Sequence, residues 1–296
     1  MENVLTLEQP DGYLTHYRLW GPANDEDVIV MLHGGMSHSG WQGPLGTRIG
    51  QLPRTAFIAV DLRGSGLNDG RGHIPSGELA VRDITRLLRH LKVSYGRVHL
   101  AGWCFGAQVA TVAAAQLAGE QVISSLIMIS PGFFFNDRYS DVLDRSIESA
   151  LAVVEELGVT PEPTRAYISV PLRACDFTDR PEWQEFVDSD PLRLVRVTSS
   201  TIDSWEEIAI QSEKDYSRIG QIPVLAVFGK GDKLVDNNRV RDFLVGHPGV
   251  RVHELDTGHA IHFEDADTLS GLFGAHIGHE PGPAARAPLR QAPPRS

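Results

Sequence analysis

The sequence predicts a doubly wound α/β sheet with helices on both faces. Short runs of β-branched and other apolar residues alternate along the chain with segments of helical periodicity. Uninterrupted apolar runs are typical of strands buried on both faces of a parallel sheet. Alternation of such strands with helices favours parallel pairing through right-handed crossovers.

The predicted strands and helices follow one another in a regular order. We predict strands at residues 27–33, 55–61, 97–103, 124–130, 222–229 and 250–255. We predict helices at residues 77–92, 105–118, 236–245 and 265–277. The first helix carries an apolar stripe suited to packing on the sheet, made of Leu79, Ile84, Leu87, Leu88 and Leu91.

Two segments interrupt this order. Residues 133–217 carry long amphipathic patterns and few strand-like runs, which predicts a mostly helical insertion forming a cap over the site. Residues 280–296 are rich in proline and alanine without apolar periodicity, which predicts a disordered tail. We therefore divide the chain into a core of residues 1–132 and 218–279, the cap, and the tail.

Composition argues against several classes of function. The net charge of −11 and the isoelectric point near 5.5 argue against nucleic acid or an anionic membrane as a partner. We find no secretory signal pattern and no apolar stretch of about 20 residues that would predict a membrane span. The two cysteines stand in unlike contexts, so we expect no disulfide framework and a cytoplasmic location. We predict no metal and no other cofactor, and the sequence does not specify an oligomeric state.

The most informative motif is the corner between the strand at 97–103 and the helix that follows it. In GWCFG, Gly102 and Gly106 flank Cys104 where the two backbones must crowd together. Such a turn strains the central residue and pushes its side chain outward. Unpaired N–H groups at the helix N-terminus favour the thiolate form. Cys104 is thus the candidate nucleophile, and the alternative is a small side chain packed at a tight turn.

The candidate base is His259. It follows a glycine after the last predicted strand, at the edge of the sheet where catalytic groups of open α/β folds collect. We place His253 within that strand and predict a structural role for His262 on the next helical turn.

The candidate acid is Asp232, which follows the strand at 222–229 at the same edge. A carboxylate there can hold the imidazole tautomer and stabilise the charged ring. Asp236 is an alternative, which we expect to cap the following helix instead. Asp256 is a weaker alternative because it is too close to His259 along the chain to face its ring easily.

A candidate anion site follows the strand at 27–33. Gly34 and Gly35 let the backbone turn an N–H group toward the nucleophile. The N–H groups of Gly35 and Phe105 would then stabilise the oxyanion of a tetrahedral intermediate. Two glycines after a strand also fit a plain turn. The anion site is favoured because it completes an ordered set with the candidate nucleophile, acid and base.

This ordered set of motifs resembles the α/β-hydrolase superfamily over residues 10–278. The matching segments are LHGG at 32–35, DLRGSGLND at 61–69, GWCFGA at 102–107, GKGDKLVD at 229–236 and TGHAIHFED at 257–265. The resemblance implies an α/β-hydrolase fold with an eight-stranded, mostly parallel sheet and a helical lid inserted after the sixth strand. It also implies catalysis by Cys104, Asp232 and His259, with Gly35 and Phe105 as the oxyanion hole.

Cys104 departs from the superfamily pattern, because most relatives have serine at this position. Dienelactone hydrolases resemble the chain at this elbow but lack the large helical insertion. Cysteine-type thioesterases and acyltransferases of natural-product pathways are similar in both respects. The superfamily pattern also implies that DLRGSG is a structural turn and not a phosphate-binding loop, with Asp61, Arg63, Gly64 and Gly66 as its members.

A cysteine nucleophile narrows the chemistry. A thiol beside His259 forms a thiolate–imidazolium pair, which is a strong nucleophile at neutral pH. Acyl transfer from a thioester to the thiol is nearly isoenergetic, whereas transfer from an unactivated ester or amide is uphill. We therefore expect an activated small-molecule acyl substrate: a thioester, including one bound to a carrier protein or coenzyme A, a lactone or an activated ester. The acyl-enzyme would be resolved by hydrolysis, transfer or cyclisation, in small-molecule biosynthesis.

The residues around the elbow and in the insertion supply rings for a hydrophobic acyl pocket. We predict that Trp103, Phe133 and Phe134 bind the substrate. Further aromatic candidates from the insertion are Phe135, Tyr139, Trp183 and Trp205. The alternative is that these rings fill the core of the lid.

Two other functions fit the same fold. One is a lyase, isomerase or cyclase that uses His259 without an acyl intermediate, and there Cys104→Ser would be almost silent. The other is a small-molecule binding protein on a hydrolase scaffold, and there Cys104→Ala would keep full activity.

Overall fold

An eight-stranded sheet forms the centre of the protein in the computed structural model, which describes residues 2–23, 26–137 and 167–279 together with residues 139, 141, 145 and 148. The strand order is β1-β2-β4-β3-β5-β6-β9-β10. The strands are β1 Glu2–Glu8, β2 Leu14–Trp20, β3 Asp27–Leu32, β4 Thr55–Val60, β5 Arg97–Trp103, β6 Ile123–Ile129, β9 Val224–Gly229 and β10 Val250–Leu255. From β4 to β10 all neighbouring strands are parallel, which confirms the predicted mostly parallel sheet.

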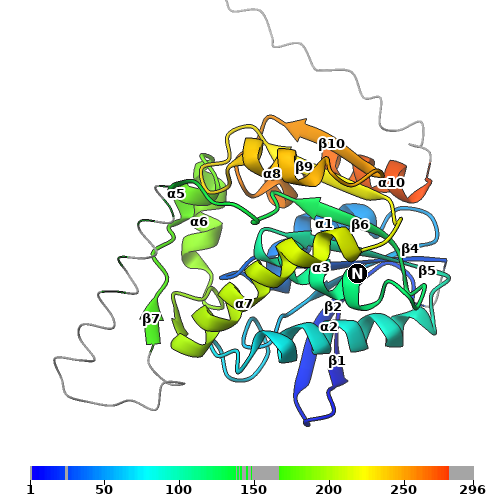
Figure 1. The fold of residues 1–296 in the computed structure, drawn as a ribbon, viewed down its shortest axis with the longest axis horizontal. Coiled ribbons are helices and arrows are strands. Elements are labelled where there is room, and N and C mark those ends of the chain that lie inside the picture. Colours follow the sequence, from blue (N-terminus) through cyan, green and yellow to red (C-terminus); the bar gives the residue numbers. More distant parts are fainter. Residues whose placement is uncertain are drawn as a thin grey trace, which may run out of the picture.

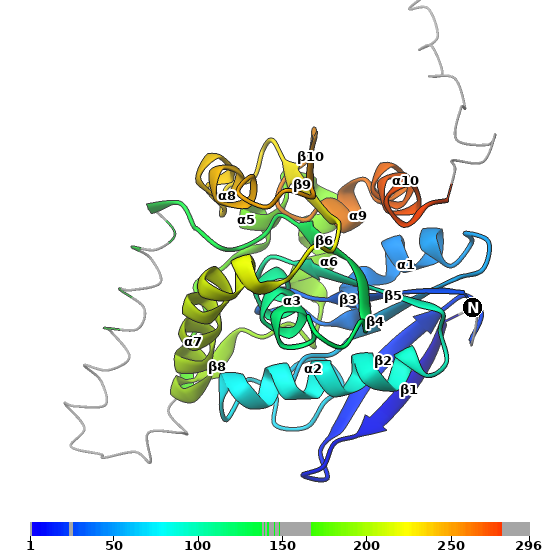
Figure 2. The ribbon, with the colours of Figure 1, turned by 45° about the vertical axis from the view of Figure 1, so that its right-hand side comes forward.

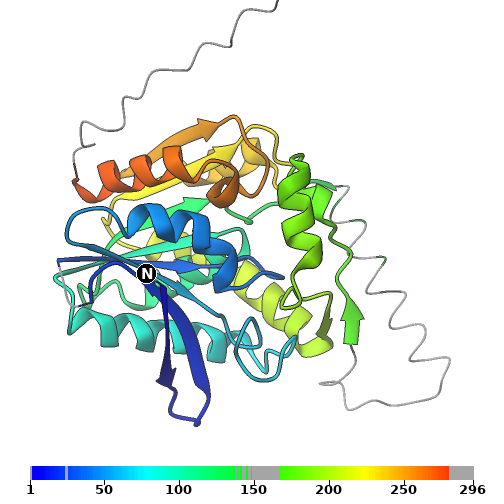
Figure 3. The ribbon, with the colours of Figure 1, turned by 180° about the vertical axis from the view of Figure 1, so that it is seen from behind.

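The first two strands were not predicted individually from the sequence. They form an antiparallel hairpin, and β2 continues the sheet by antiparallel pairing with β4. Nearly all of β1 is exposed, and β2 alternates between buried and less buried residues. Neither strand is therefore a continuous apolar run. Figure 3 shows the hairpin extending away from the body of the molecule.

Helices cover both faces of the sheet, as Figure 2 shows. One face carries α2 Gly77–Lys92, α3 Phe105–Gln116 and α8 Asn237–Leu244, and the other carries α1 Gly43–Ile49 and α10 Ala266–Ile277. The predicted helices are confirmed within about two residues at each end. The short helices α1 and α9 Ile261–Glu264 were not predicted.

Strand β3 shows why the sheet must be covered on both faces. Val28, Val30 and Leu32 belong to one hydrophobic cluster, while Ile29 and Met31 belong to the other. Successive side chains of a strand point to opposite faces, so a fully apolar strand contributes to two cores. The continuous apolar run in the sequence thus corresponds to burial on both sides.

The insertion lies between β6 and β9, after the sixth strand as predicted. Its described elements are β7 Tyr167–Ser169, α5 Ala174–Phe177, α6 Pro181–Ser189, β8 Arg196–Thr198, α7 Ser199–Asp215 and a 3-10 turn at Tyr216–Arg218. Figure 1 shows β7, α5 and α6 at one end of the molecule, with α7 running from there toward α3. The described part of the insertion is mostly helical, and β7 and β8 pair there as a small antiparallel sheet. The predicted tail at 280–296 lies outside the described residues.

The lid is attached to the loop that follows β3. The Asp190 carboxylate accepts hydrogen bonds from His38 Nε2 at 2.7 Å and Trp41 Nε1 at 2.5 Å. The Leu194 N–H group donates to the Met36 carbonyl at 2.9 Å. These bonds hold the lid beside the loop that carries the candidate anion site.

None of the helices in the described ranges is long and apolar enough to span a membrane.

Candidate active site

Cys104 stands at the turn between β5 and α3 in a strained conformation. Its φ of 53° and ψ of −118° are unusual for a residue with a side chain, and such strain costs about 1–3 kcal/mol. The glycines on either side permit the close approach of the two elements. A Cβ atom at Gly106 would collide with the Leu32 carbonyl, and one at Gly102 would collide with the Gly106 backbone. The corner predicted from GWCFG is therefore present.

Backbone contacts hold this corner in place. The Cys104 N–H group donates to the Ile129 carbonyl at 3.0 Å. The Cys104 carbonyl in turn accepts from Gly132 at 3.2 Å. The side chain of Gln108 on α3 donates through Nε2 to the Gly132 carbonyl at 2.8 Å. The loop after β6 thus wraps around the cysteine and fixes its position.

The structure brings His259 and Asp232 together from two different loops. His259 Nδ1 donates to Asp232 Oδ2 at 2.8 Å, and both side chains are fully buried. The other carboxylate oxygen of Asp232 accepts from the N–H groups of Leu234 at 2.9 Å and Val235 at 3.0 Å. These three donors fix the carboxylate. An ionised carboxylate can only accept hydrogen bonds, so the bond to Asp232 requires that His259 carries a proton on Nδ1.

The second ring nitrogen of His259, Nε2, does not bond to Asp232. Nε2 is buried and has no hydrogen bond of normal geometry within the described residues. Burial acts to lower the pKa of His259, but the charges of Asp232 and Cys104 outweigh it and raise the pKa to about 10. The site thereby favours the imidazolium form of His259 beside the Asp232 carboxylate.

His259 is also held through its backbone and by ring contacts. Its carbonyl accepts from Trp103 Nε1 at 2.9 Å, and its ring packs against those of Trp103 and Phe177. The Glu264 carboxylate accepts from the N–H group of Gly258 at 3.1 Å and closes the turn before the histidine. Trp103, the residue before Cys104, thus also helps to position His259.

The alternatives to Asp232 lie elsewhere. Asp236 caps α8 by accepting from the Arg239 N–H group at 3.1 Å, as expected. Asp256 is exposed.

In the described part of the chain, no group of three or more His, Cys, Asp or Glu residues is arranged to hold a metal ion.

His262 is buried beside the site, with its ring 4.3 Å from that of Trp103 between ring centroids. Neither ring nitrogen has a hydrogen-bond partner among the described residues. Burial, together with the charge of His259, lowers the pKa of His262 well below its usual range. A neutral ring packed in this way fits the structural role predicted for it.

The loop after β3 lies directly beside the cysteine. A Cβ atom at Gly34 would contact the Cys104 Cβ at 3.4 Å. The loop turns at once, because the Ser37 N–H and hydroxyl groups both donate to the Gly34 carbonyl, at 3.2 and 3.1 Å. His33 links this loop to the loop after β4. Its Nδ1 donates to the Gly34 carbonyl at 2.7 Å, and its Nε2 accepts from the Leu62 N–H group at 3.0 Å.

Gly35 and Phe105 both line the same cavity as Cys104. The Phe105 N–H group is in the first turn of α3, where no carbonyl of the helix can accept from it. Trp205 of α7 covers both residues: its ring lies 5.8 Å from that of Phe105 and 3.3 Å from the position of a Cβ on Gly35. The lid therefore closes over the candidate anion site.

The cavity has a volume of about 360 Å³. Lid and core residues share its wall, which is mainly apolar and includes Met36, Val170, Leu172, Phe177, Ile202 and Leu234. Its polar side chains, apart from the cysteine, are Ser37, Gln108, Tyr139 and Glu206. A concave apolar site with few polar groups is typical of a small-molecule pocket.

The aromatic residues predicted to bind substrate divide into two sets. Trp103 lines the cavity, as do Phe135, Tyr139 and Trp205. The structure does not bring Phe133 and Phe134 to it, which corrects the sequence prediction. The rings of Phe133 and Phe134 pack against Phe243, at centroid distances of 5.0 and 5.6 Å. Trp183, a further aromatic candidate, packs against Phe186 and Phe263.

For Phe134 the reason is the backbone of the loop after β6. Phe135 forms an antiparallel bridge with Val235, and the Asp236 N–H group donates to the Phe134 carbonyl at 3.0 Å. Neighbouring side chains of an extended segment point to opposite sides. Phe135 therefore faces the cavity while Phe134 faces α8, where it packs under the Arg239 guanidinium.

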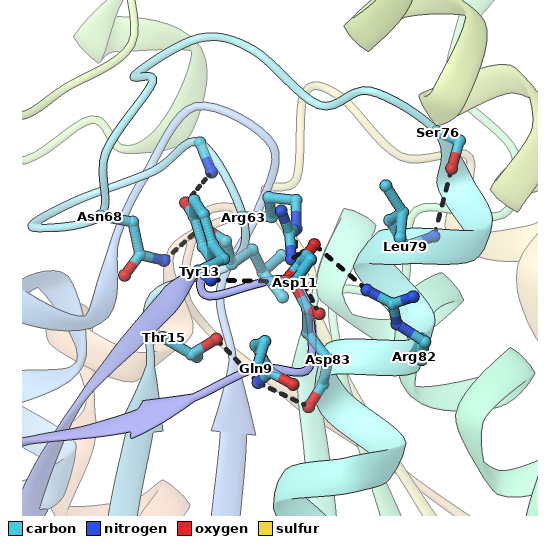
Figure 4. A network of polar contacts seen from close by, with 12 residues as sticks. Gln9, Asp11, Tyr13, Thr15, Arg63, Asn68, Ser76, Leu79, Arg82 and Asp83 are labelled. Atoms are coloured by element: carbon cyan, nitrogen blue, oxygen red, sulfur yellow. Dashed lines mark hydrogen bonds and ion pairs between the residues drawn. The ribbon is translucent and has the colours of Figure 1, made fainter.

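The DLRGSG segment is a structural turn, as expected. Arg63 is buried and donates to the Asp83 carboxylate at 2.7 Å and to Asp11 at 3.0 Å, above the ring of Tyr13 (Figure 4). The Asp61 carboxylate accepts from the N–H groups of Ser39 at 2.7 Å and Leu67 at 2.9 Å. The carboxylates already partner the arginine, so the segment is not built to hold a phosphate.

Comparisons with known proteins agree with this architecture. A family model described as serine aminopeptidase, S33, matches residues 23–266. The chain belongs to this family. Its fold and its family make it a hydrolase of the α/β-hydrolase fold. No curated protein sequence matches the chain.

Solved structures show the same fold at low sequence identity. A monoglyceride lipase from Saccharomyces cerevisiae, in complex with a substrate analog, has a TM-score of 0.76 at 17% identity, covering 93% of this chain and 95% of that one. An esterase from Exiguobacterium antarcticum has a TM-score of 0.68 at 19% identity, covering 92% and 98%. A thioesterase domain from the curacin biosynthetic pathway has a TM-score of 0.62 at 18% identity, covering 92% and 99%.

The functional residues missed from the sequence belong to the walls of the cavity. Gln108 and Leu234 lie close to the predicted motifs but carry no motif of their own. Val170, Leu172 and Ile202 come from the lid, where the amphipathic pattern predicts a helix or strand but not which side faces the core. Only contacts between distant segments bring them to Cys104.

Proposed function

We propose that the protein catalyses acyl transfer through a triad of Cys104, His259 and Asp232. The observation that carries this proposal is a strained cysteine at the wall of a cavity, electrostatically coupled to a buried histidine that a fixed carboxylate orients. A nucleophile, a base and an orienting acid in this relation are the recurring parts of covalent acyl transfer.

In the proposed mechanism His259 Nε2 takes the thiol proton and the Cys104 sulfur attacks the carbonyl carbon of the substrate. The N–H groups of Gly35 and Phe105 donate to the resulting oxyanion. When the tetrahedral intermediate collapses, the bond to the leaving group breaks, and His259 returns the proton to that group. This gives a thioester acyl-enzyme.

The second half-reaction reverses these roles. His259 takes a proton from water or from a hydroxyl or amine acceptor, which attacks the thioester carbonyl. Collapse of the second tetrahedral intermediate releases the product, and the thiolate accepts the proton from His259. Hydrolysis, transfer and cyclisation differ only in which acceptor the cavity admits.

The substrate we propose is an activated acyl compound: a thioester, carried by a protein or coenzyme A or free, a lactone or an activated ester. The cysteine supports this class, because its acyl-enzyme is itself a thioester and is not readily reached from an unactivated ester. The mainly apolar cavity supports an acyl group that is largely hydrocarbon. A role in small-molecule biosynthesis fits such donors.

Intact-mass spectrometry after incubation with the octanoyl thioester of N-acetylcysteamine tests the proposal. We expect the octanoyl mass on the wild type and on Cys175→Ala, which removes the other cysteine, and none on Cys104→Ala. Turnover of the thioester by Cys104→Ala at the wild-type rate would refute covalent catalysis. It would favour chemistry that uses His259 alone.

A further inference from the structure

Tyr139 places a phenol hydroxyl at the wall of the mainly apolar cavity. Its ring packs on that of Phe135 at 4.9 Å between centroids. Phe135 in turn lies against Gly132, where a Cβ atom would be 3.1 Å from the Phe135 ring and 3.3 Å from the Cys104 sulfur. Tyr139 therefore stands on the side of the nucleophile formed by the loop after β6.

The loop that carries Tyr139 is fixed to the loop that carries Asp232. The Asn136 N–H group donates to the Leu234 carbonyl at 2.8 Å, and its side chain donates to the Lys233 carbonyl at 3.0 Å. The Tyr139 N–H group closes a turn onto the Asn136 carbonyl at 2.9 Å. The segment that leads to Tyr139 is thus held against the loop that carries the candidate acid.

The hydroxyl of Tyr139 remains a proton donor at any physiological pH. Burial raises its pKa above the usual range, and the negative charges of Cys104 and Asp176 raise it further. Within the described residues no hydrogen bond reaches this hydroxyl. A largely buried donor that finds no acceptor among these residues would gain free energy from a ligand oxygen.

The oxygen of the reacting carbonyl is not the partner that this geometry suggests. That oxygen would face the N–H groups of Gly35 and Phe105, both of which lie against Trp205, whereas Gly132 lies against Phe135. A donor on the Gly132 side meets a different part of the bound acyl group, close to the sulfur. An oxygen on a carbon near the reacting carbonyl would lie within its reach.

We propose that Tyr139 selects acyl groups that carry a keto or hydroxyl oxygen near the reacting carbonyl. The inference rests on the proposed acyl transfer at Cys104 and narrows its substrate class to oxygenated acyl donors. The rest of the acyl group would occupy the apolar part of the cavity. Tyr139 is then a specificity-determining residue, because it binds the substrate without taking part in the proton transfers.

The test compares kcat/KM for octanoyl, β-ketooctanoyl and β-hydroxyoctanoyl thioesters of N-acetylcysteamine, which share one leaving group and one chain length. For Tyr139→Phe we expect a loss of about threefold to tenfold for the two oxygenated donors, the effect of one hydrogen bond, and less than twofold for octanoyl. Phenylalanine keeps the ring contact with Phe135. The matched control is Tyr167→Phe, an exposed tyrosine of the lid, which should change none of the three values.

An equal loss for all three donors in Tyr139→Phe would overturn the inference, and so would an unchanged preference. The wild-type values test it without any variant: if neither oxygenated donor is preferred over octanoyl, the inference fails. In these cases acylation of Cys104 by octanoyl thioester, seen by intact mass, shows that the proposed function still stands. Absence of any adduct on Cys104 with all three donors would refute both.

Discussion

Replacement of Asp232 by Asn tests how the carboxylate controls the histidine. The two oxygens of Asp232 have different partners: one accepts from the N–H groups of Leu234 and Val235, and the other accepts from His259 Nδ1. In the Asn variant the amide oxygen must take the first position, because two N–H donors point at it. The amide NH₂ group then faces His259.

This substitution therefore inverts the tautomer of the ring. An NH₂ group donates, so Nδ1 must carry the lone pair and the proton moves to Nε2. A protonated neutral Nε2 cannot take the proton of the Cys104 thiol. The variant keeps the shape of the site but loses the base.

The size of the effect follows from the charge as well as from the tautomer. Raising the pKa of His259 from 6.5 to about 10 corresponds to about 5 kcal/mol of added stabilisation of the imidazolium, shared between Asp232 and Cys104. Loss of the acid in a serine triad lowers kcat by about 10⁴. We expect Asp232→Asn to slow acylation of Cys104 by about 10³ or more.

The assay is single-turnover acylation by octanoyl thioester, followed by intact mass, together with alkylation of Cys104 by iodoacetamide at neutral pH. Both rates should fall in Asp232→Asn. Asp236→Asn changes only the cap of α8 in the same loop, and Asp256→Asn changes an exposed carboxylate, so both should keep the wild-type rates. If Asp232→Asn acylates within tenfold of the wild type, the carboxylate does not control the base and the reasoning is wrong.

Three further predictions concern the nucleophile, the pH dependence of stability and the lid. Cys104→Ser should react with the thioester at least tenfold more slowly than the wild type in the same mass assay, because a neutral hydroxyl replaces the thiolate. An equal rate would contradict a role for the ion pair. His33 is fully buried with its pKa lowered by burial to about 4, so the unfolded chain binds a proton that the folded chain does not. The free energy of unfolding that His33 contributes is complete above pH 6.5 and is lost as the pH falls toward 4, by about 2 kcal/mol at pH 5. Urea unfolding at pH 7 and 5 should show a loss of this order. A free energy of unfolding that stays constant over this range would contradict it. Asp190→Ala leaves His38 and Trp41 as buried donors without their acceptor and should lower the free energy of unfolding by about 2–3 kcal/mol, measured by urea. Asp188→Ala, which removes an exposed carboxylate near the end of α6, should change it by less than 1 kcal/mol.

Much of the fold follows from local sequence. Apolar runs such as residues 55–61 are long enough only for a strand and too apolar for one exposed face, and they became the buried strands of the sheet. Asp236 precedes a helical pattern, and it caps α8. The hairpin of β1 and β2 escaped prediction because β1 is largely exposed and β2 alternates between buried and less buried residues, so neither strand is a continuous apolar run.

The sequence by itself determined the order of the elements, the strained corner at Cys104 and the loops from which His259 and Asp232 come, because each depends on a few neighbouring residues. The tertiary structure decided which side chains form the cavity. Phe135 and Tyr139 line the cavity and Phe134 does not, because the loop after β6 pairs with the loop after β9 about a hundred residues away. Phe133 packs on Phe243 instead. Side-chain direction in an irregular segment is set by such backbone partners, and no local pattern records them.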